Sequence, residues 1–133
     1  MKKTVTLFCI VILSVLSTTA FSQRLVGNWN IVAFQTIKVG EPGFTLSDIG
    51  VISFFKDGSG ESNVDYSMMG VQKNEQIAFV WNIAQGLISI QGQESDFTRT
   101  WIMIEDKRNS QKWQSTDGRF TVYTLELKKQ KKK

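Results

Sequence analysis

The 133-residue chain contains no histidine, one cysteine and one proline. Histidine is the most common general base and a frequent metal ligand, so its absence removes the usual catalytic triads and histidine metal sites. The cysteine, Cys9, lies in the N-terminal apolar segment, which leaves the rest of the chain without a thiolate or a disulfide. Most carboxylates fall in turns, as at Asp57, Asp106 and Asp117, where aspartate has a backbone role. The sequence therefore predicts a protein that is not an enzyme and has no metal site or cofactor.

One long apolar run, residues 4–16, follows a pair of lysines near the N-terminus. Ala20 and Ser22 then occupy the −3 and −1 positions of a signal-peptidase site. The apolar run is too short to cross a bilayer comfortably, so residues 1–22 are interpreted as a secretory signal peptide. The mature chain would begin at Gln23, have no transmembrane segment, and be periplasmic or secreted. The alternative is an uncleaved membrane anchor.

Positive charge is concentrated at the two ends of the chain. The net charge is +4, but two lysines belong to the predicted signal peptide and five of the last six residues are lysine. Between these ends the net charge is about −3. A nucleic-acid surface needs basic and aromatic residues spread over a folded face, so nucleic acid is excluded as a partner. Residues 129–133 are predicted to be a disordered basic tail, with weak contact to an anionic surface, such as phospholipid headgroups or lipopolysaccharide, as the alternative.

Short runs of β-branched and aromatic residues fill residues 23–128, with turns about every ten residues. Asp57-Gly58 and Asp117-Gly118 are strong hairpin signals. The pattern predicts one all-β domain, an antiparallel up-and-down meander of about eight strands that closes into a barrel. A Greek-key sandwich would need longer crossovers. The expected strands are residues 26–39, 49–56, 60–69, 75–83, 87–91, 97–105, 111–114 and 119–127, with a bend near residues 34–36 and a long loop at 40–48.

The segment Gly27-Asn28-Trp29 opens the first expected strand. It resembles the Gly-x-Trp signature of the lipocalins. The order of motifs along the chain is similar to that of the short lipocalin-like proteins exported by Bacteroidetes-type bacteria. Those proteins have an L-x-G-x-W opening, an F-x-x-D-G-x-G hairpin, a later W-x-I/L strand and a final Y-x-L-x-L-K. The matching residues are Leu25, Gly27 and Trp29; Phe54, Asp57, Gly58 and Gly60; Trp81 and Ile83; and Tyr123, Leu125, Leu127 and Lys128.

The opening motif has a physical role in such a barrel. A tryptophan at the start of the first strand fills the narrow base, and the glycine lets a neighbouring backbone approach. Lipocalins usually lay an arginine of the last strand across that indole in a cation–π contact. This chain has a lysine there instead, so the predicted base consists of Gly27, Trp29 and Lys128.

Eight-stranded barrels are filled by side chains or hold one small ligand. The resemblance implies that the protein binds a small apolar or amphipathic molecule. Arg99 is the expected anchor of an acidic headgroup, and the alternative is that it lies on the outer face or at the rim. Trp81 and Trp101 are the expected walls, and Trp113, in a short strand with polar neighbours, is expected to contribute less. The expected ligand-binding residues are Tyr66, Met68, Phe79, Trp81, Arg99, Trp101 and Tyr123.

The alternative function is a non-catalytic interaction module. An exported inhibitor or assembly factor would have a solid core and would bind its partner through the loops at the open end of the barrel. The expected loops are residues 40–48 and 69–75, and the second begins with adaptable methionines.

Overall fold

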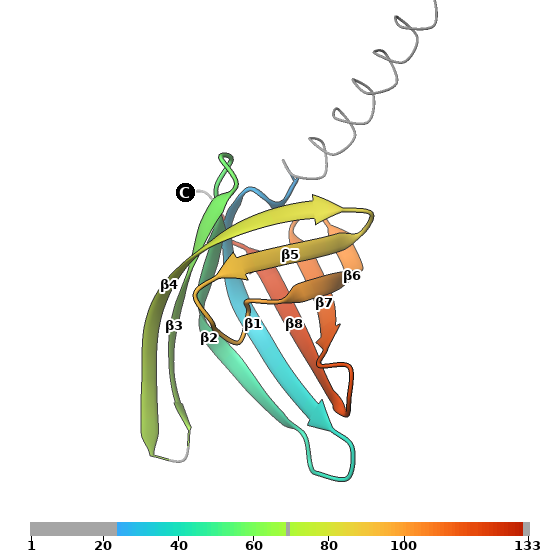
Figure 1. Ribbon diagram of the computed structural model, residues 1–133. Helices are drawn as coiled ribbons and strands as arrows, with labels where there is room; N and C mark the ends of the chain where they lie inside the picture. The colour runs from blue at the N-terminus through green and yellow to red at the C-terminus, as the bar shows by residue number, and fades with distance from the viewer. Residues whose placement is uncertain (1–23, 69, 132–133) are drawn as a thin grey trace, which may run out of the picture.

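The computed structural model describes residues 24–68 and 70–131, so the predicted signal peptide lies outside the described residues. Eight antiparallel strands each pair with their neighbours in sequence, and the last pairs with the first, which closes the sheet into a barrel (Figure 1). The predicted all-β, lipocalin-like meander is confirmed. The strands are β1 (Gly27–Lys38), β2 (Phe44–Phe54), β3 (Ser59–Met68), β4 (Val71–Ala84), β5 (Leu87–Gly92), β6 (Thr100–Lys107), β7 (Ser110–Thr116) and β8 (Thr121–Lys129).

Two strands begin earlier than the sequence predicts, and both differences shorten an expected loop. Residues 44–47 of β2 pair with β1, so the expected loop at 40–48 is mostly strand. Residues 71–74 of β4 pair with β3, so most of the expected loop at 69–75 is strand. The first residues of β4 are mostly polar and none of them is buried. They therefore lack the alternation of apolar and polar residues by which a strand is predicted from sequence.

Strand β1 contains a β-bulge just before residues 34–36, where the sequence predicts a bend. Its register shifts between Ile31 and Ala33 relative to both β2 and β8. Ile31 and Phe34 are both buried although they are three residues apart, a spacing that strict alternation forbids. The bulge adds one residue and returns the side chains to the interior.

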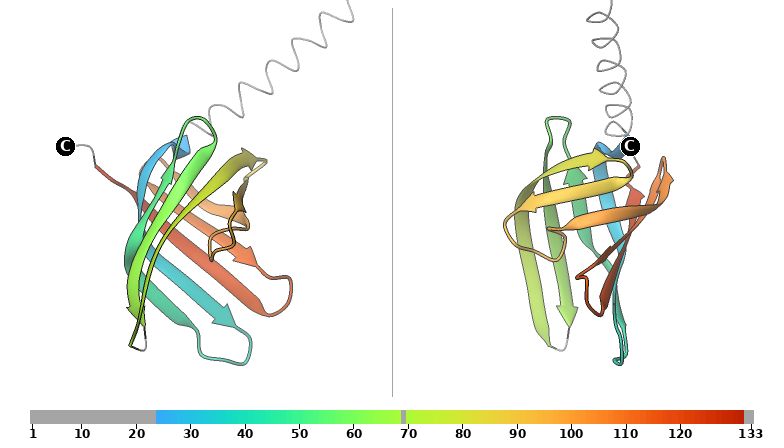
Figure 2. Two further views of the ribbon diagram at one scale, coloured as in Figure 1. Left: turned by 60° about the vertical axis from the view of Figure 1, so that its left-hand side comes forward. Right: turned by 45° about the vertical axis from the view of Figure 1, so that its right-hand side comes forward.

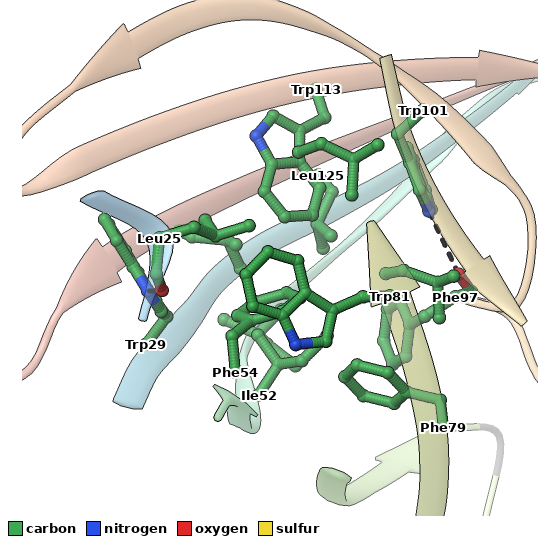
Figure 3. Packing of buried hydrophobic residues seen from close by; sticks show 14 of the residues in the cluster. Leu25, Trp29, Ile52, Phe54, Phe79, Trp81, Phe97, Trp101, Trp113 and Leu125 are labelled. Carbon is green, nitrogen blue, oxygen red and sulfur yellow. Dashed lines mark hydrogen bonds between the residues drawn. The ribbon is translucent and has the colours of Figure 1, made fainter. Parts of the chain in front are cut away.

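Large aromatic side chains fill the narrow end of the barrel (Figure 3). Trp29, Trp101, Trp113 and Phe54 have no exposed surface. The ring of Phe54 lies 5.3 Å from that of Trp81 and 5.8 Å from that of Trp113. Each indole nitrogen donates a hydrogen bond: Trp29 to Leu25 O, Trp81 to Ser59 O, Trp101 to Phe97 O and Trp113 to Gln111 Oε1.

The cation over Trp29 is Lys129, not Lys128 as predicted. Lys129 Nζ lies 5.4 Å from the centroid of the indole ring, whereas Lys128 is exposed. Alternate residues of a strand face opposite sides, so Lys129 shares the inner face of the buried Leu127. The close neighbour of Gly27 is the same lysine, since an added Cβ would lie 3.0 Å from Lys129 Cε. Lys129 therefore belongs to β8 and to the barrel base, and the predicted tail begins one residue too early.

The barrel is tightly closed at this narrow end and splayed at the other. Strands β2 and β3 pair only between residues 50–54 and 60–64, and β5 and β6 only between residues 87–89 and 100–102. Beyond these pairs the β1–β2 and β3–β4 hairpins diverge (Figures 1 and 2). The open end is therefore a mouth between two hairpins.

Two hairpin turns at Asp-Gly sequences are held by aspartate side chains. Asp57 Oδ1 accepts hydrogen bonds from Ser59 Oγ at 2.6 Å and from Ser59 N at 2.9 Å. Asp117 Oδ1 accepts from Arg119 N at 2.8 Å and from Thr121 N at 3.2 Å. These hydrogen bonds stabilise the charged carboxylates and hold the pKa of both groups below the ordinary value of 3.8.

The lowered pKa values predict a pH dependence of stability. The two carboxylates stabilise the fold above pH 3.8, and this contribution is lost as the pH falls through their lowered pKa values. In the double variant Asp57→Asn/Asp117→Asn, we expect the midpoint of thermal unfolding to fall less between about pH 5 and about pH 2.5 than in the wild type. Circular dichroism at constant ionic strength measures this, with Asp48→Asn as the matched control. An equal fall in all three proteins would contradict the assignment.

Candidate binding site at the open end of the barrel

The residues predicted to bind a ligand lie in two environments. Phe79, Trp81 and Trp101 belong to the core, with 5%, 8% and 0% of their surface exposed. Tyr66 and Tyr123 are partly buried and pack against that core near the open end. Arg99 is half-buried beside Tyr123. Met68 ends β3, where it pairs with Val71 at the tip of the β3–β4 hairpin.

The two tryptophans predicted as cavity walls pack against other side chains instead. A side chain that lined a ligand-sized cavity would keep accessible surface on that side, and Trp101 keeps none. The Trp101 indole donates its hydrogen bond to Phe97 O, a contact drawn in Figure 3. Trp113, which the sequence placed outside the site, lies 6.4 Å from Trp101 and is equally buried. These aromatic residues form one packed cluster.

The pocket that the described residues enclose behind the mouth is small. Side chains of β1 to β4 and of the β5–β6 connection, residues 93–99, enclose a pocket of about 10 Å³. This is about the smallest space that holds one water molecule. This part of the interior is thus filled by protein. The lining residues are Phe34, Ile49, Ser62, Val64, Tyr66, Lys73, Glu75, Ile77, Ser95, Asp96 and Phe97.

Arg99 ends a row of aromatic rings at the mouth. Its guanidinium carbon lies 3.8 Å from the centroid of the Tyr123 ring and 5.8 Å from that of Trp101. The Phe34 ring stacks near Tyr123 at 6.2 Å, and Phe97 meets Phe34 edge to face at 5.5 Å. A cation–π contact of this kind contributes about 0.5–2 kcal/mol. The stacked Tyr123 ring therefore covers one face of the Arg99 guanidinium group and holds it in place.

The β5–β6 connection holds Arg99 in this place through short-range hydrogen bonds. Thr98 Oγ1 donates to Gln93 O at 2.7 Å, and Phe97 N donates to Ser95 Oγ at 3.2 Å. Arg99 O accepts a hydrogen bond from Ile90 N at 3.0 Å, which ties the connection to β5. Serine and threonine side chains favour such turns, so the sequence SDFTR orders the chain just before the arginine.

The charge of Arg99 is not neutralised within the described ranges 24–68 and 70–131. Its guanidinium makes no ion pair there, and its Nε is buried without a hydrogen-bond partner. Buried donors are normally paired, and an unpaired one costs about 1–3 kcal/mol. An oxygen atom that accepted this hydrogen bond would remove the cost.

The other cation inside the mouth, Lys73, is fully paired. Its Nζ lies 3.4 Å from an oxygen of Asp96 and 3.7 Å from one of Glu75. Burial alone would lower the pKa of Lys73, but Asp96, Tyr66 and Glu75 outweigh it and raise the pKa above the ordinary 10.5. Lys73 thus links β4 to the β5–β6 connection, a role the sequence did not indicate.

In the described part of the chain, no group of three or more Asp, Glu, His or Cys side chains is placed to hold a metal ion. No helix among these residues is long and apolar enough to cross a membrane. No protein-family model matches the sequence, and no curated protein sequence is significantly similar to it.

Proposed function

We propose that this protein is an exported, non-catalytic, lipocalin-like binding module that holds a small amphipathic molecule at the open end of its barrel. In this proposal the anionic group of the molecule binds Arg99. The observation that carries the proposal is the unpaired guanidinium of Arg99, fixed against Tyr123 with its Nε buried and unsatisfied.

The geometry of the stacked arginine suits an anion. Contact with the Tyr123 ring occupies one face of the guanidinium and leaves the N–H groups at its edge to donate. A carboxylate or phosphate accepts two such hydrogen bonds side by side. Because the donors already stand in a half-buried site, an anion there would meet less competition from water than at the surface.

The apolar part of the ligand has a surface beside Arg99. On the inner face of the β1–β2 hairpin, the register places Phe44 opposite Thr36 and Thr36 opposite Tyr123. Phe44 therefore lies two strand spacings, about 10 Å, from Tyr123. It is 44% exposed, so its ring is accessible. The ligand would lie across the mouth and not in a deep cavity, since the pocket behind the mouth is only about 10 Å³.

A protein partner is the second candidate, and one observation favours it. The turns at the open end expose apolar side chains, including Val39 at 73%, Val71 at 69% and Phe120 at 63%. A partner that presents an acidic side chain to Arg99 and apolar side chains to these residues would cover the same end.

Titration with dodecanoate and dodecyl phosphate, below their micelle concentrations, tests the proposal through tryptophan emission. Trp101 lies 5.8 Å from the guanidinium and reports on it. We expect saturable changes in the wild type and an affinity at least about tenfold lower in Arg99→Gln, because a hydrogen bond to a charged group is lost. Arg99→Lys, which keeps the charge without the fork, should be intermediate.

The matched control is Arg119→Gln, which removes the same charge from an exposed turn at the same end. It should bind both probes within about twofold of the wild type. Neutral dodecanol should not distinguish the wild type from Arg99→Gln. Equal affinities for the charged probes in wild type and Arg99→Gln would refute the ligand proposal. Native mass spectrometry of protein from its own host would then separate a co-purifying small molecule from a protein partner.

A further inference from the structure

A hollow of about 480 Å³, partly open to solvent, lies beside the β6–β7 turn and the C-terminal end of β8, at the opposite end of the barrel from the mouth. Because the hollow is partly open to solvent, this volume includes space that a bound group would not fill. Three of its lining residues are cationic, the other two carry amides, and none is a carboxylate. The lining residues are Arg108, Asn109, Lys129, Gln130 and Lys131.

The walls of the hollow are held by backbone hydrogen bonds. Lys129 N donates to Asn109 O at 2.9 Å, which joins the end of β8 to the β6–β7 turn. Gln130 N donates to Asn28 O at 2.9 Å, and Gln130 Nε2 donates to Asn30 Oδ1 at 2.9 Å. The chain therefore continues along β1 past the end of the last strand, and the hollow is part of the folded domain.

No carboxylate of the described residues neutralises the cations of the hollow, and the ammonium group of Lys129 contacts only the Trp29 ring at 5.4 Å and Arg24 O at 3.4 Å. Within the described residues, Arg108, Lys129 and Lys131 make no ion pair. The nearby carboxylate of Asp106 is already used, since it accepts from Arg24 Nη1 at 3.1 Å and from Gln111 Nε2 at 2.7 Å. Three uncompensated positive charges around one concavity attract an anion that carries more than one charge.

We propose that this hollow binds a phosphate group. The guanidinium of Arg108 suits bidentate contact with phosphate oxygens, and the ammonium groups of Lys129 and Lys131 add point charges. Asn109 and Gln130 add neutral donors beside them. The phosphate would come from a lipid headgroup or from a soluble phosphate compound. The site lies at the opposite end from Arg99, so it does not depend on the function proposed above.

Arg108 distinguishes a site formed by the fold from non-specific attraction to the charged C-terminal tail. Arg108 lies on the β6–β7 turn, far in sequence from the terminal lysines, and the fold brings it to them. Its neighbour Lys107 is an exposed cation on the same turn that does not line the hollow. Arg108→Gln and Lys107→Gln are therefore a matched pair with equal change of charge.

The test has a lipid arm and a soluble arm. In the first, the protein is sedimented with phosphatidylcholine vesicles, with and without phosphatidic acid, at about 0.1 M salt. In the second, pyrophosphate binding is measured by calorimetry. We expect Arg108→Gln to weaken binding about fivefold in whichever arm the wild type binds, and Lys107→Gln to weaken it less than twofold.

The pattern of binding identifies the source of the phosphate. Binding to vesicles with phosphatidic acid, competed by pyrophosphate, indicates a lipid headgroup, and binding of pyrophosphate alone indicates a soluble compound. Either result supports the proposed phosphate site if Arg108→Gln binds more weakly than Lys107→Gln. Equal losses in the two variants would mean non-specific charge, and loss only on removal of residues 132–133 would mean a tail contact. Either result, or no binding in both arms, overturns the proposal.

Discussion

Replacing Trp29 by alanine is expected to lower the free energy of unfolding by about 3–5 kcal/mol, the usual cost of removing a buried large aromatic side chain. Trp29 has no exposed surface, and its indole donates to Leu25 O at 2.8 Å. The ammonium group of Lys129 lies over the ring, with its Nζ 5.4 Å from the ring centroid. The substitution would open a cavity at the base, where β1 and β8 close the barrel.

Urea denaturation followed by circular dichroism measures this loss. Trp29→Phe keeps most of the packing and removes the hydrogen bond, so it should cost less than the alanine variant. Phe120→Ala, which truncates an aromatic ring that is 63% exposed, should change stability by less than about 0.5 kcal/mol. A loss below about 1 kcal/mol for Trp29→Ala would show that the Gly-x-Trp match at the barrel opening is accidental.

The topology was predictable because its determinants are local. Asp57-Gly58 and Asp117-Gly118 mark hairpin turns wherever they occur between strands, and both aspartates bond to the turn backbone as expected. The alternation of Phe79, Trp81 and Ile83 fixes the inward face of one strand, and all three are buried. Short turns between such strands leave a meander as the simplest arrangement.

The register of the barrel could not be predicted in the same way. The bulge between Ile31 and Ala33 shifts the face of every later residue of β1, and no local signal in the sequence marks it. The lysine over Trp29 depends on pairing between the two ends of the chain. A shift of one residue in the β1–β8 register would place Lys128 over the Trp29 ring, but the observed register places Lys129 there.

Trp113 shows why polar neighbours misled the core prediction. Gln111 is only 1% exposed, yet it is fully hydrogen-bonded: its Oε1 accepts from the Trp113 indole, and its Nε2 donates to Asp106 and to Lys107 O. A polar residue whose donors and acceptors are satisfied can be buried at little cost. The strand that looked half-exposed therefore carries a central core residue.

Individual residues of the candidate site were predicted from the sequence, but the contacts between them were not. Arg99 was expected to anchor an acidic group, and Tyr123 was expected among the ligand-binding residues. That the two stack at 3.8 Å follows from the fold, since Arg99 lies in the β5–β6 connection and Tyr123 lies on β8. The pairing of Lys73 with Asp96 also joins distant segments, so local patterns could not reveal that, among the described residues, Lys73 is paired at the mouth and Arg99 is not.

Replacing Gly50 by alanine is expected to destabilise the protein by more than about 3 kcal/mol, because it combines a backbone clash with an unfavourable conformation. Gly50 has φ of +153°, and an added Cβ would overlap Asn63 O and lie 3.0 Å from Val64 Cα. Both of these atoms belong to the backbone of β3 and cannot rotate away. Gly50 is also the first residue of β2 that pairs with β3, so the strands approach most closely where they begin to diverge.

Gly86→Ala is the matched control for this effect. Gly86 has φ of +76° in the β4–β5 turn, but nothing lies within 4 Å of the added Cβ, so only the conformational cost of about 1 kcal/mol applies. The same urea denaturation compares the two variants. Equal losses would mean that β2 and β3 relax apart without cost. A much larger loss for Gly50→Ala would mean that the tight crossing fixes the angle between the two hairpins, and with it the width of the mouth beside Arg99.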